Sequence, residues 1–231
     1  MSSSNKRLLI IGASRGLGYA LAAEYLERGW DVTGTVRGSQ RTKLHDLEAA
    51  YGGRLAIESV DINDPAQVTG LCGRLAEKSF DLLLINAGVK NDDRETIADV
   101  STDEFVRVMV TNALSPMRVV ETMQHLVPSG TIAVMSSGLG SVANNTNGNY
   151  EVYRGSKAAL NMFMRSFAAR HAADPRTLLL LAPGWVRTDM GGPNARLSIE
   201  ESIPNLANTI DAQAGKGGLQ YLDYLGRAVP W

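Results

Sequence analysis

Residues 7–18 read RLLIIGASRGLG, a short apolar run followed at once by a glycine-rich turn. An uninterrupted apolar run of this length is typical of a strand buried on both faces of a parallel sheet. Gly12, Gly16 and Gly18 are spaced Gly-x3-Gly-x-Gly, unlike the commoner Gly-x-Gly-x-x-Gly dinucleotide fingerprint. Such glycines either form a plain turn or let backbone N–H groups at a helix N-terminus bind a pyrophosphate. The stretch therefore predicts a strand, a turn suited to phosphate and a helix.

The alternation of strand and helix continues along the chain. Apolar runs that predict strands read RLLIIG, DVTGTV, RLAIESV, DLLLINAG, GTIAVMSS and RTLLLLAPG. Stretches of helical length lie at 16–29, 64–77, 101–126 and 153–172. Ser101 with Glu104, and Ser198 with Glu201, form capping-box patterns. The order predicts an α/β fold with a doubly wound, Rossmann-like parallel sheet and right-handed crossovers, in a single domain over residues 1–231.

Composition excludes several classes of function. The 231 residues carry 23 basic and 24 acidic side chains, which gives no electrostatic reason to expect nucleic acid or a membrane as a partner. Cys72 is the only cysteine, so no internal disulfide can form, and a reducing, cytoplasmic location is expected. His45, His125 and His171 lack metal-ligand spacing, so no metal site is predicted. The first apolar run is too short to span a membrane, and no signal-peptide pattern follows it.

The end of the second predicted strand bears on the choice of cofactor. An acidic residue there would hold a free ribose 2′-hydroxyl, whereas an arginine suits a 2′-phosphate. The strand ends TVRGS, which puts Arg37 at that place, and Arg15 lies inside the glycine-rich turn. With no acid beside them in the sequence, the two guanidinium groups favour NADP over NAD. The alternative is that both arginines are solvated surface residues.

A tyrosine and a lysine stand four positions apart in YRGSK, residues 153–157. Positions i and i+4 lie on the same face of a helix, so Lys157 is expected close to Tyr153. Taken alone, such a pair is also ordinary on an exposed helix face.

Six stretches together resemble the short-chain dehydrogenase/reductases. They are GASRGLG, NAG at 86–88, Asn112, SS at 136–137, YRGSK and PGWVRTDM at 183–190, which occur in that family's order across nearly the whole chain. Within the family, YRGSKAALN and PGWVRTDMGG are most similar to the small carbonyl reductases related to bacterial C-factor proteins.

The resemblance implies four catalytic residues. Tyr153 would exchange a proton with the substrate, and Lys157 would hold the nicotinamide ribose. Because a free tyrosine has a pKa of about 10, the Lys157 ammonium and an oxidised nicotinamide are expected to lower it. Ser137 would hydrogen-bond the substrate oxygen, with Ser136 as the alternative because the loop ANNTNGN lengthens the interval to Tyr153. Asn112 would take part in a proton relay.

Asn112 also has a physical reason to bind water. Pro116, four residues later, has no N–H to donate to the carbonyl of residue 112. A carbonyl freed in this way usually finds a water molecule, and relatives are described as relaying protons through it. The alternative is a simple proline kink.

Further cofactor contacts follow from the resemblance. Asn86, Ala87 and Gly88 would let adenosine approach the backbone, Asp61 and Ile62 would flank the adenine, and Pro183 to Thr188 would cover the nicotinamide. The full set of expected cofactor-binding residues is Gly12, Ser14, Arg15, Gly16, Leu17, Gly18, Arg37, Asp61, Ile62, Asn86, Ala87, Gly88, Tyr153, Lys157, Pro183, Gly184, Val186 and Thr188. A substrate lid is expected at about 189–205, where Leu197 and Ile203 either touch substrate or seal the core.

The sequence thus predicts an NADPH-dependent reductase of a small, uncharged carbonyl compound. Two alternatives stay open: a non-catalytic NADP-binding sensor or signalling protein, and an alcohol dehydrogenase working in the oxidative direction. Met162, Phe163, Met164 and Phe167 exceed what one buried helix stripe needs. They either pack against a second subunit, giving a homodimer or homotetramer, or belong to the core.

Overall fold

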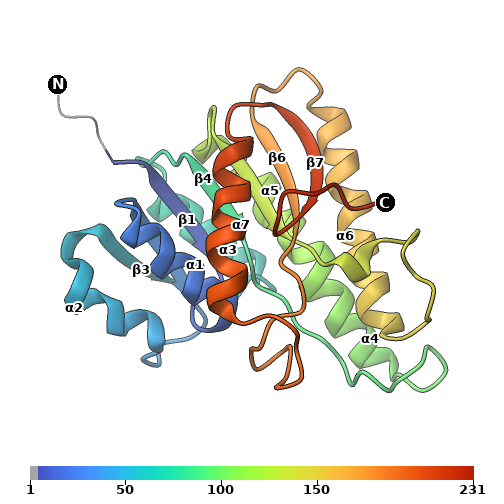
Figure 1. The fold of residues 1–231 in the computed structure, drawn as a ribbon. Helices are drawn as coiled ribbons and strands as arrows, with labels where there is room; N and C mark the ends of the chain where they lie inside the picture. Colours follow the sequence, from blue (N-terminus) through green and yellow to red (C-terminus); the bar gives the residue numbers. More distant parts are fainter. Residues whose placement is uncertain (1–4) are drawn as a thin grey trace.

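The computed structural model describes residues 5–231 and contains one seven-stranded parallel sheet with helices on both faces (Figure 1). The strand order is β3-β2-β1-β4-β5-β6-β7. The strands are β1 (Arg7–Ile11), β2 (Asp31–Val36), β3 (Leu55–Ser59), β4 (Leu82–Ile85), β5 (Thr131–Met135), β6 (Thr177–Ala182) and β7 (Gly218–Asp223). The order reverses between β1 and β4, so the doubly wound fold is confirmed.

The helices form two layers, and alternation along each strand supplies both cores. The helices are α1 (Gly16–Glu27), α2 (Glu48–Tyr51), α3 (Pro65–Arg74), α4 (Thr102–Met109), α5 (Ser115–Met123), α6 (Glu151–Arg170) and α7 (Ile199–Gln213). Leu9 and Ile11 pack with side chains of α3, α5 and α6, while Leu8 and Ile10 pack with those of α1 and α7. Burial on both faces explains why β1 reads as an unbroken apolar run.

The strand β7 was not predicted from the sequence. Its residues, GLQYLD, run from exposed to partly buried, and only Tyr221 and Leu222 are buried. An edge strand of this kind has neither an unbroken apolar run nor strict alternation, so pattern alone does not separate it from a loop.

The predicted helix over 101–126 is divided into several parts. A π-helical turn, Val110–Leu114, separates α4 from α5, and a short 3₁₀ turn, Gln124–Leu126, ends the segment. The capping box at Ser198 and Glu201 is complete. At Ser101 only half of the box forms, because the Glu104 carboxylate bonds Arg107 instead of returning to the cap.

Burial decides between alternatives that the sequence left open for residues of α6 and of the predicted lid. Met164 and Phe167 on α6 are buried in the core, so only Met162 and Phe163, which are exposed, remain for a predicted second subunit. Ile203 belongs to a 15-residue helix, α7, and packs in the core beside α1, so it seals the core. Within residues 5–231, no helix is long and apolar enough to cross a bilayer.

Candidate active site

The glycine-rich turn after β1 lies against the end of β4, at the reversal of strand order. Gly12 has φ +90°, and a Cβ on it would stand 2.9 Å from the Cα of Ala87. A Cβ on Gly18 would overlap the carbonyl oxygen of Gly12, which also accepts a hydrogen bond from Asn86 Nδ2 at 2.8 Å. Only glycine fits at these two positions, and the turn stays narrow enough for backbone N–H groups to reach a ligand.

The turn is also fixed from β2 by a residue that the sequence did not single out. Thr35 accepts from the N–H of Gly12 through Oγ1 at 2.9 Å and from the N–H of Ala13 through its carbonyl at 2.7 Å. Ser14 and Leu17 are partly buried in the turn. A threonine in a buried strand is too common for pattern alone to mark it.

Arg15 does have an acid beside it, contrary to the expectation from the sequence. Its guanidinium lies 3.4 Å from the Asp189 carboxylate, and the two side chains are 74% and 78% exposed. Asp189 lies after β6, so only the folded chain brings the pair together. Arg37 is exposed just beyond the end of β2. The two arginines thus follow the neighbouring strands β1 and β2 at one edge of the sheet.

The loop after β3 places Asp61 and Ile62 differently. Asp61 is partly exposed, and its Oδ1 accepts from the N–H of Asn63 at 2.9 Å. Ile62 is buried in the core, so its side chain does not share the exposure of Asp61. Of the two, Asp61 has a side chain free to face a ligand.

Asn112 is fully buried in the π-helical turn, and its amide makes three hydrogen bonds. Oδ1 accepts from the N–H of Val89 at 2.8 Å, while Nδ2 donates to the Val89 carbonyl at 2.7 Å and to Ser156 Oγ at 3.0 Å. Ser156 in turn donates to the carbonyl of Tyr153 at 2.7 Å. The side chain therefore ties the loop after β4 to the first turns of α6.

Lys157 is buried beside that loop. Its Nζ donates to the carbonyl of Met135 at 2.9 Å and lies 5.9 Å from the centre of the Tyr153 ring. A Cβ on Gly88 would stand 3.6 Å from Nζ and 3.3 Å from Asn112 Oδ1. The structure therefore brings Asn112 and Lys157 together at Gly88 of the NAG segment, with the Tyr153 ring beside Lys157.

Burial shifts the pKa values of Tyr153 and Lys157. Desolvation raises the pKa of Tyr153 to about 12, and interaction with the Ser137 side chain acts in the opposite direction. Desolvation lowers the pKa of Lys157 to about 8. For the protein chain alone, the pKa of Tyr153 is therefore raised, whereas the sequence led to the expectation that it would be lowered. The reason is that the ammonium bonds Met135 rather than the phenol oxygen, so burial dominates.

The two serines after β5 have different surroundings. Ser136 is 2% exposed, and its hydroxyl donates to Asn161 Oδ1 at 2.6 Å. Ser137 is partly exposed, and its Oγ accepts from the N–H of Leu139 at 3.1 Å, which leaves its own O–H available as a donor. The Ser137 carbonyl accepts from the hydroxyl of Tyr221 on β7. The geometry thus favours Ser137 for contact with a substrate.

Asn161 and Tyr221 support this pair of serines without having been predicted. Asn161 lies four residues beyond Lys157 on α6, and its Nδ2 also donates to the carbonyl of Gly140 at 3.2 Å. The i+4 spacing from Lys157 could have pointed to it. Tyr221 could not be found, because its strand was missed.

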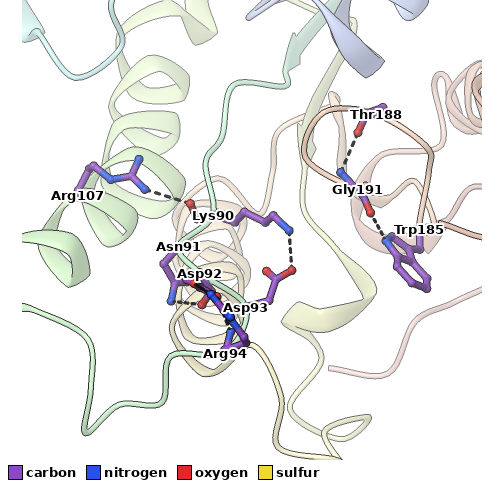
Figure 2. Close-up of polar contacts among 9 residues, drawn as sticks. All are labelled: Lys90, Asn91, Asp92, Asp93, Arg94, Arg107, Trp185, Thr188 and Gly191. Atoms are coloured by element: carbon purple, nitrogen blue, oxygen red, sulfur yellow. Dashed lines mark hydrogen bonds and ion pairs between the residues drawn. The ribbon is translucent and has the colours of Figure 1, made fainter. Parts of the chain in front are cut away.

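The segment that follows β6 is closed on itself by internal hydrogen bonds. Figure 2 shows Trp185 Nε1 donating to the Gly191 carbonyl at 2.8 Å and the Gly191 N–H donating to Thr188 Oγ1 at 3.1 Å. Pro183 and Val186 are buried, and Gly184 has φ +84°. The N–H of Leu197 donates to the Trp185 carbonyl at 2.9 Å, so the segment folds back on itself before α7 begins.

A charged loop after β4, residues 90–94, also follows the carboxyl end of a strand. Figure 2 shows that its charges are paired locally: Lys90 with Asp93 at 2.7 Å and Arg94 with Asp92 at 2.7 Å. Arg107 on α4 donates to the Lys90 carbonyl at 3.1 Å. The loop is held in place and presents little net charge.

Comparisons with known proteins identify the family of the chain and agree with its fold. The family model for short chain dehydrogenases matches residues 6–196. The C-signal protein of Myxococcus xanthus is 38% identical over 154 residues, which cover 65% of this chain and 92% of that protein. A short-chain dehydrogenase/reductase of Burkholderia multivorans with bound NADP superimposes with a TM-score of 0.97 at 58% identity, covering 99% of this chain and 100% of the other. A carbonyl reductase of Pseudomonas aeruginosa in complex with NADP gives 0.91 at 35% identity, with 99% and 100% covered. The resemblance inferred from the motifs is confirmed, and the chain belongs to the short-chain dehydrogenase/reductase family.

Proposed function

We propose that the protein is an NADPH-dependent reductase of ketones or aldehydes. The observation that carries the proposal is that Asn112 and Lys157 meet at Gly88, with the Tyr153 ring beside the Lys157 ammonium and the Ser137 side chain interacting with the Tyr153 phenol. Lys157, Asn112 and the backbone of Ser137 are each held by hydrogen bonds to other elements of the fold, which is how an active site is preorganised.

The residues of the glycine-rich turn and the two arginines fit a dinucleotide cofactor that carries a 2′-phosphate. The narrow turn at Gly12 and Gly18 leaves room for a pyrophosphate beside backbone N–H groups, and Arg15 and Arg37 offer exposed guanidinium groups for a 2′-phosphate. The Burkholderia and Pseudomonas relatives, whose structures contain NADP, support the same choice. When bound, NADPH supplies the hydride.

The side chains divide the remaining work. With its pKa raised to about 12 by burial, Tyr153 is protonated at neutral pH and can donate a proton to the oxygen of a carbonyl that is being reduced. Ser137 donates its free O–H to the same oxygen. Lys157, whose pKa burial lowers to about 8, still carries its charge at pH 7 and holds the ribose. Asn112 restores the proton through water on its carbonyl.

The proposed substrate is a small or medium uncharged carbonyl compound. The paired charges of the 90–94 loop support this, because the loop presents neither an excess of cations nor an excess of anions. The oxidative direction would use the same residues, with Tyr153 as the base.

A signalling role is the second candidate, and the name of the C-signal relative favours it. A sensor needs a cofactor site but has no need of Ser137 and Lys157 beside Tyr153. The two candidates separate in one experiment: titration with NADPH and NADH, followed by loss of reduced-nicotinamide absorbance against a panel of aldehydes, ketones and diketones. Turnover with NADPH supports the reductase. Tight binding without turnover on any compound would favour the sensor.

A further inference from the structure

A single asparagine spans the π-helical turn that carries Asn112. Asn63, in the loop after β3, donates from Nδ2 to Thr111 Oγ1 at 3.0 Å. Its Oδ1 accepts from Ser115 Oγ at 2.8 Å. Thr111 immediately precedes Asn112, and Ser115 follows the turn by one residue. One side chain therefore bridges both ends of the turn.

The bridged hydroxyls are buried, which makes these bonds matter. Thr111 is 7% exposed and Ser115 is 0% exposed. Leaving a buried hydroxyl without a hydrogen-bond partner costs free energy. The two bonds from Asn63 therefore oppose relaxation of the π-helical turn to an ordinary α-helical register. The register is marked by the backbone, because the N–H of Ser115 bonds the carbonyl of Val110, five residues earlier.

The π-helical turn also positions the side of the candidate site that holds Tyr153. Asn112 bonds both backbone groups of Val89 and the hydroxyl of Ser156, and Ser156 bonds the carbonyl of Tyr153. A chain of contacts thus runs from Asn63 by hydrogen bonds to both ends of the turn, along the backbone of the turn to Asn112, and by two further hydrogen bonds to the backbone carbonyl of Tyr153.

The other end of the chain lies in the loop proposed to flank the adenine. The N–H of Asn63 donates to Asp61 Oδ1 at 2.9 Å, and the N–H of Asp61 donates to Gln67 Oε1 at 2.9 Å. We propose that Asn63 is a positioning residue: it holds the π-helical turn so that Asn112 and Tyr153 are aligned, and it links the adenine side of the cofactor site to the proton-transfer side. Its kinetic effect rests on the proposed function.

The kinetic test compares three variants with the wild type. Asn63→Ala removes both bonds and is expected to lower kcat about 10-fold through misalignment, with the NADPH dissociation constant within about 2-fold of wild type. In Asn63→Asp the carboxylate can accept from both hydroxyls, so kcat should return to within about 3-fold of wild type. Asp64→Ala is the matched control, because Asp64 caps α3 in the same loop without touching the turn. It should lower the melting temperature and leave kcat unchanged.

A second measurement does not depend on activity. Amide hydrogen exchange of residues 110–117 and of Val89 should accelerate in Asn63→Ala, with and without NADPH, and stay at the wild-type rate in Asp64→Ala, where only α3 should exchange faster. Slower turnover together with faster exchange at 110–117 would support the positioning role.

Two results would overturn it. One is Asn63→Ala with wild-type kcat and wild-type exchange. The other is weakened NADPH binding with unchanged exchange at 110–117, which would make Asn63 a cofactor contact only. If the wild type reduces no carbonyl compound, the proposed function fails, and the exchange measurement alone still decides whether Asn63 holds the turn.

Discussion

At the scale of single residues, burial governs how Lys157 and Tyr153 titrate. Lys157 is buried and bonds a backbone carbonyl, so it lacks the carboxylate that would keep a buried ammonium charged. The lowered pKa of Lys157 and the raised pKa of Tyr153 share desolvation as their main cause. In the free chain, the phenol is therefore in the acid form that a reduction needs.

This burial predicts a pH dependence of stability. The pKa of Lys157 is lowered by desolvation from 10.5 to about 8, so between those values the unfolded chain binds more protons, and stability rises with pH. Below pH 8 the full cost of burying the charge is present. Relative to Lys157→Met, the wild type should gain up to about 3 kcal/mol in free energy of unfolding between pH 8 and pH 10.5. Urea unfolding at both pH values measures it, and parallel pH profiles for the two proteins would contradict it.

The two neighbouring serines give a second prediction at this scale. Ser137→Ala removes the free donor and should lower kcat about 100-fold, with little change in melting temperature. Ser136→Ala removes the bond to Asn161 and should cost about 1 kcal/mol of stability while leaving most of the activity. Steady-state rates and thermal unfolding separate the two. The reverse pattern would move the substrate contact to Ser136.

Many residues of the candidate site could be predicted from the sequence. The glycines, YRGSK and the paired serines each form a short local motif, so they could be recognised from the sequence even though many of their contacts are distant, as Gly12 with Ala87 and Ser136 with Asn161 show. The bonds of Asn112 to Val89 and Ser156 join segments far apart in the chain, and no local pattern encodes them.

At the scale of elements, the glycine-rich turn is defined by close approach. Gly18→Ala would drive a methyl group into the carbonyl of Gly12 and should destabilise the fold by about 2 kcal/mol or more and weaken NADPH binding. Gly73, in α3, is the matched control, because a Cβ there meets nothing within 4 Å. Gly73→Ala should stabilise the protein by about 0.5–1 kcal/mol through helix propensity. Thermal and urea unfolding test both, and a harmless Gly18→Ala would refute the tight turn.

Helices and strands were predicted where the apolar residues follow a clear pattern in the sequence, and they were missed where no such pattern exists. All six predicted strands were found: five of them are mostly buried, and β3, which is only partly buried at the opposite edge of the sheet, was recognised from the run RLAIESV. The edge strand β7, only partly buried, and the π-helical turn, which differs from an α-helix by one residue per turn, leave no periodic signal. Pro116 pointed to an irregularity near Asn112 but not to its form.

At the scale of the whole molecule, the fold brings Asp189, which follows β6, against Arg15 in the glycine-rich turn proposed to bind the cofactor. Arg15→Gln should weaken NADPH binding about 10-fold and leave NADH binding nearly unchanged, because only the 2′-phosphate needs the guanidinium. Asp189→Asn keeps Arg15 and should bind NADPH at least as tightly as the wild type. Fluorescence titration with both nucleotides measures the difference, and an equal loss for NADH would contradict the assignment of Arg15 to the phosphate.

The most direct test of the central claim is Tyr153→Phe, assayed for NADPH binding and for carbonyl reduction on the same preparation. The substitution removes one oxygen from a partly buried side chain and keeps the ring. The account predicts NADPH affinity within about 3-fold of wild type and a loss of kcat of about 1,000-fold or more, because the proton donor is gone. Turnover within about 10-fold of wild type, with binding intact, would show that Tyr153 is not the proton donor and would contradict the mechanism.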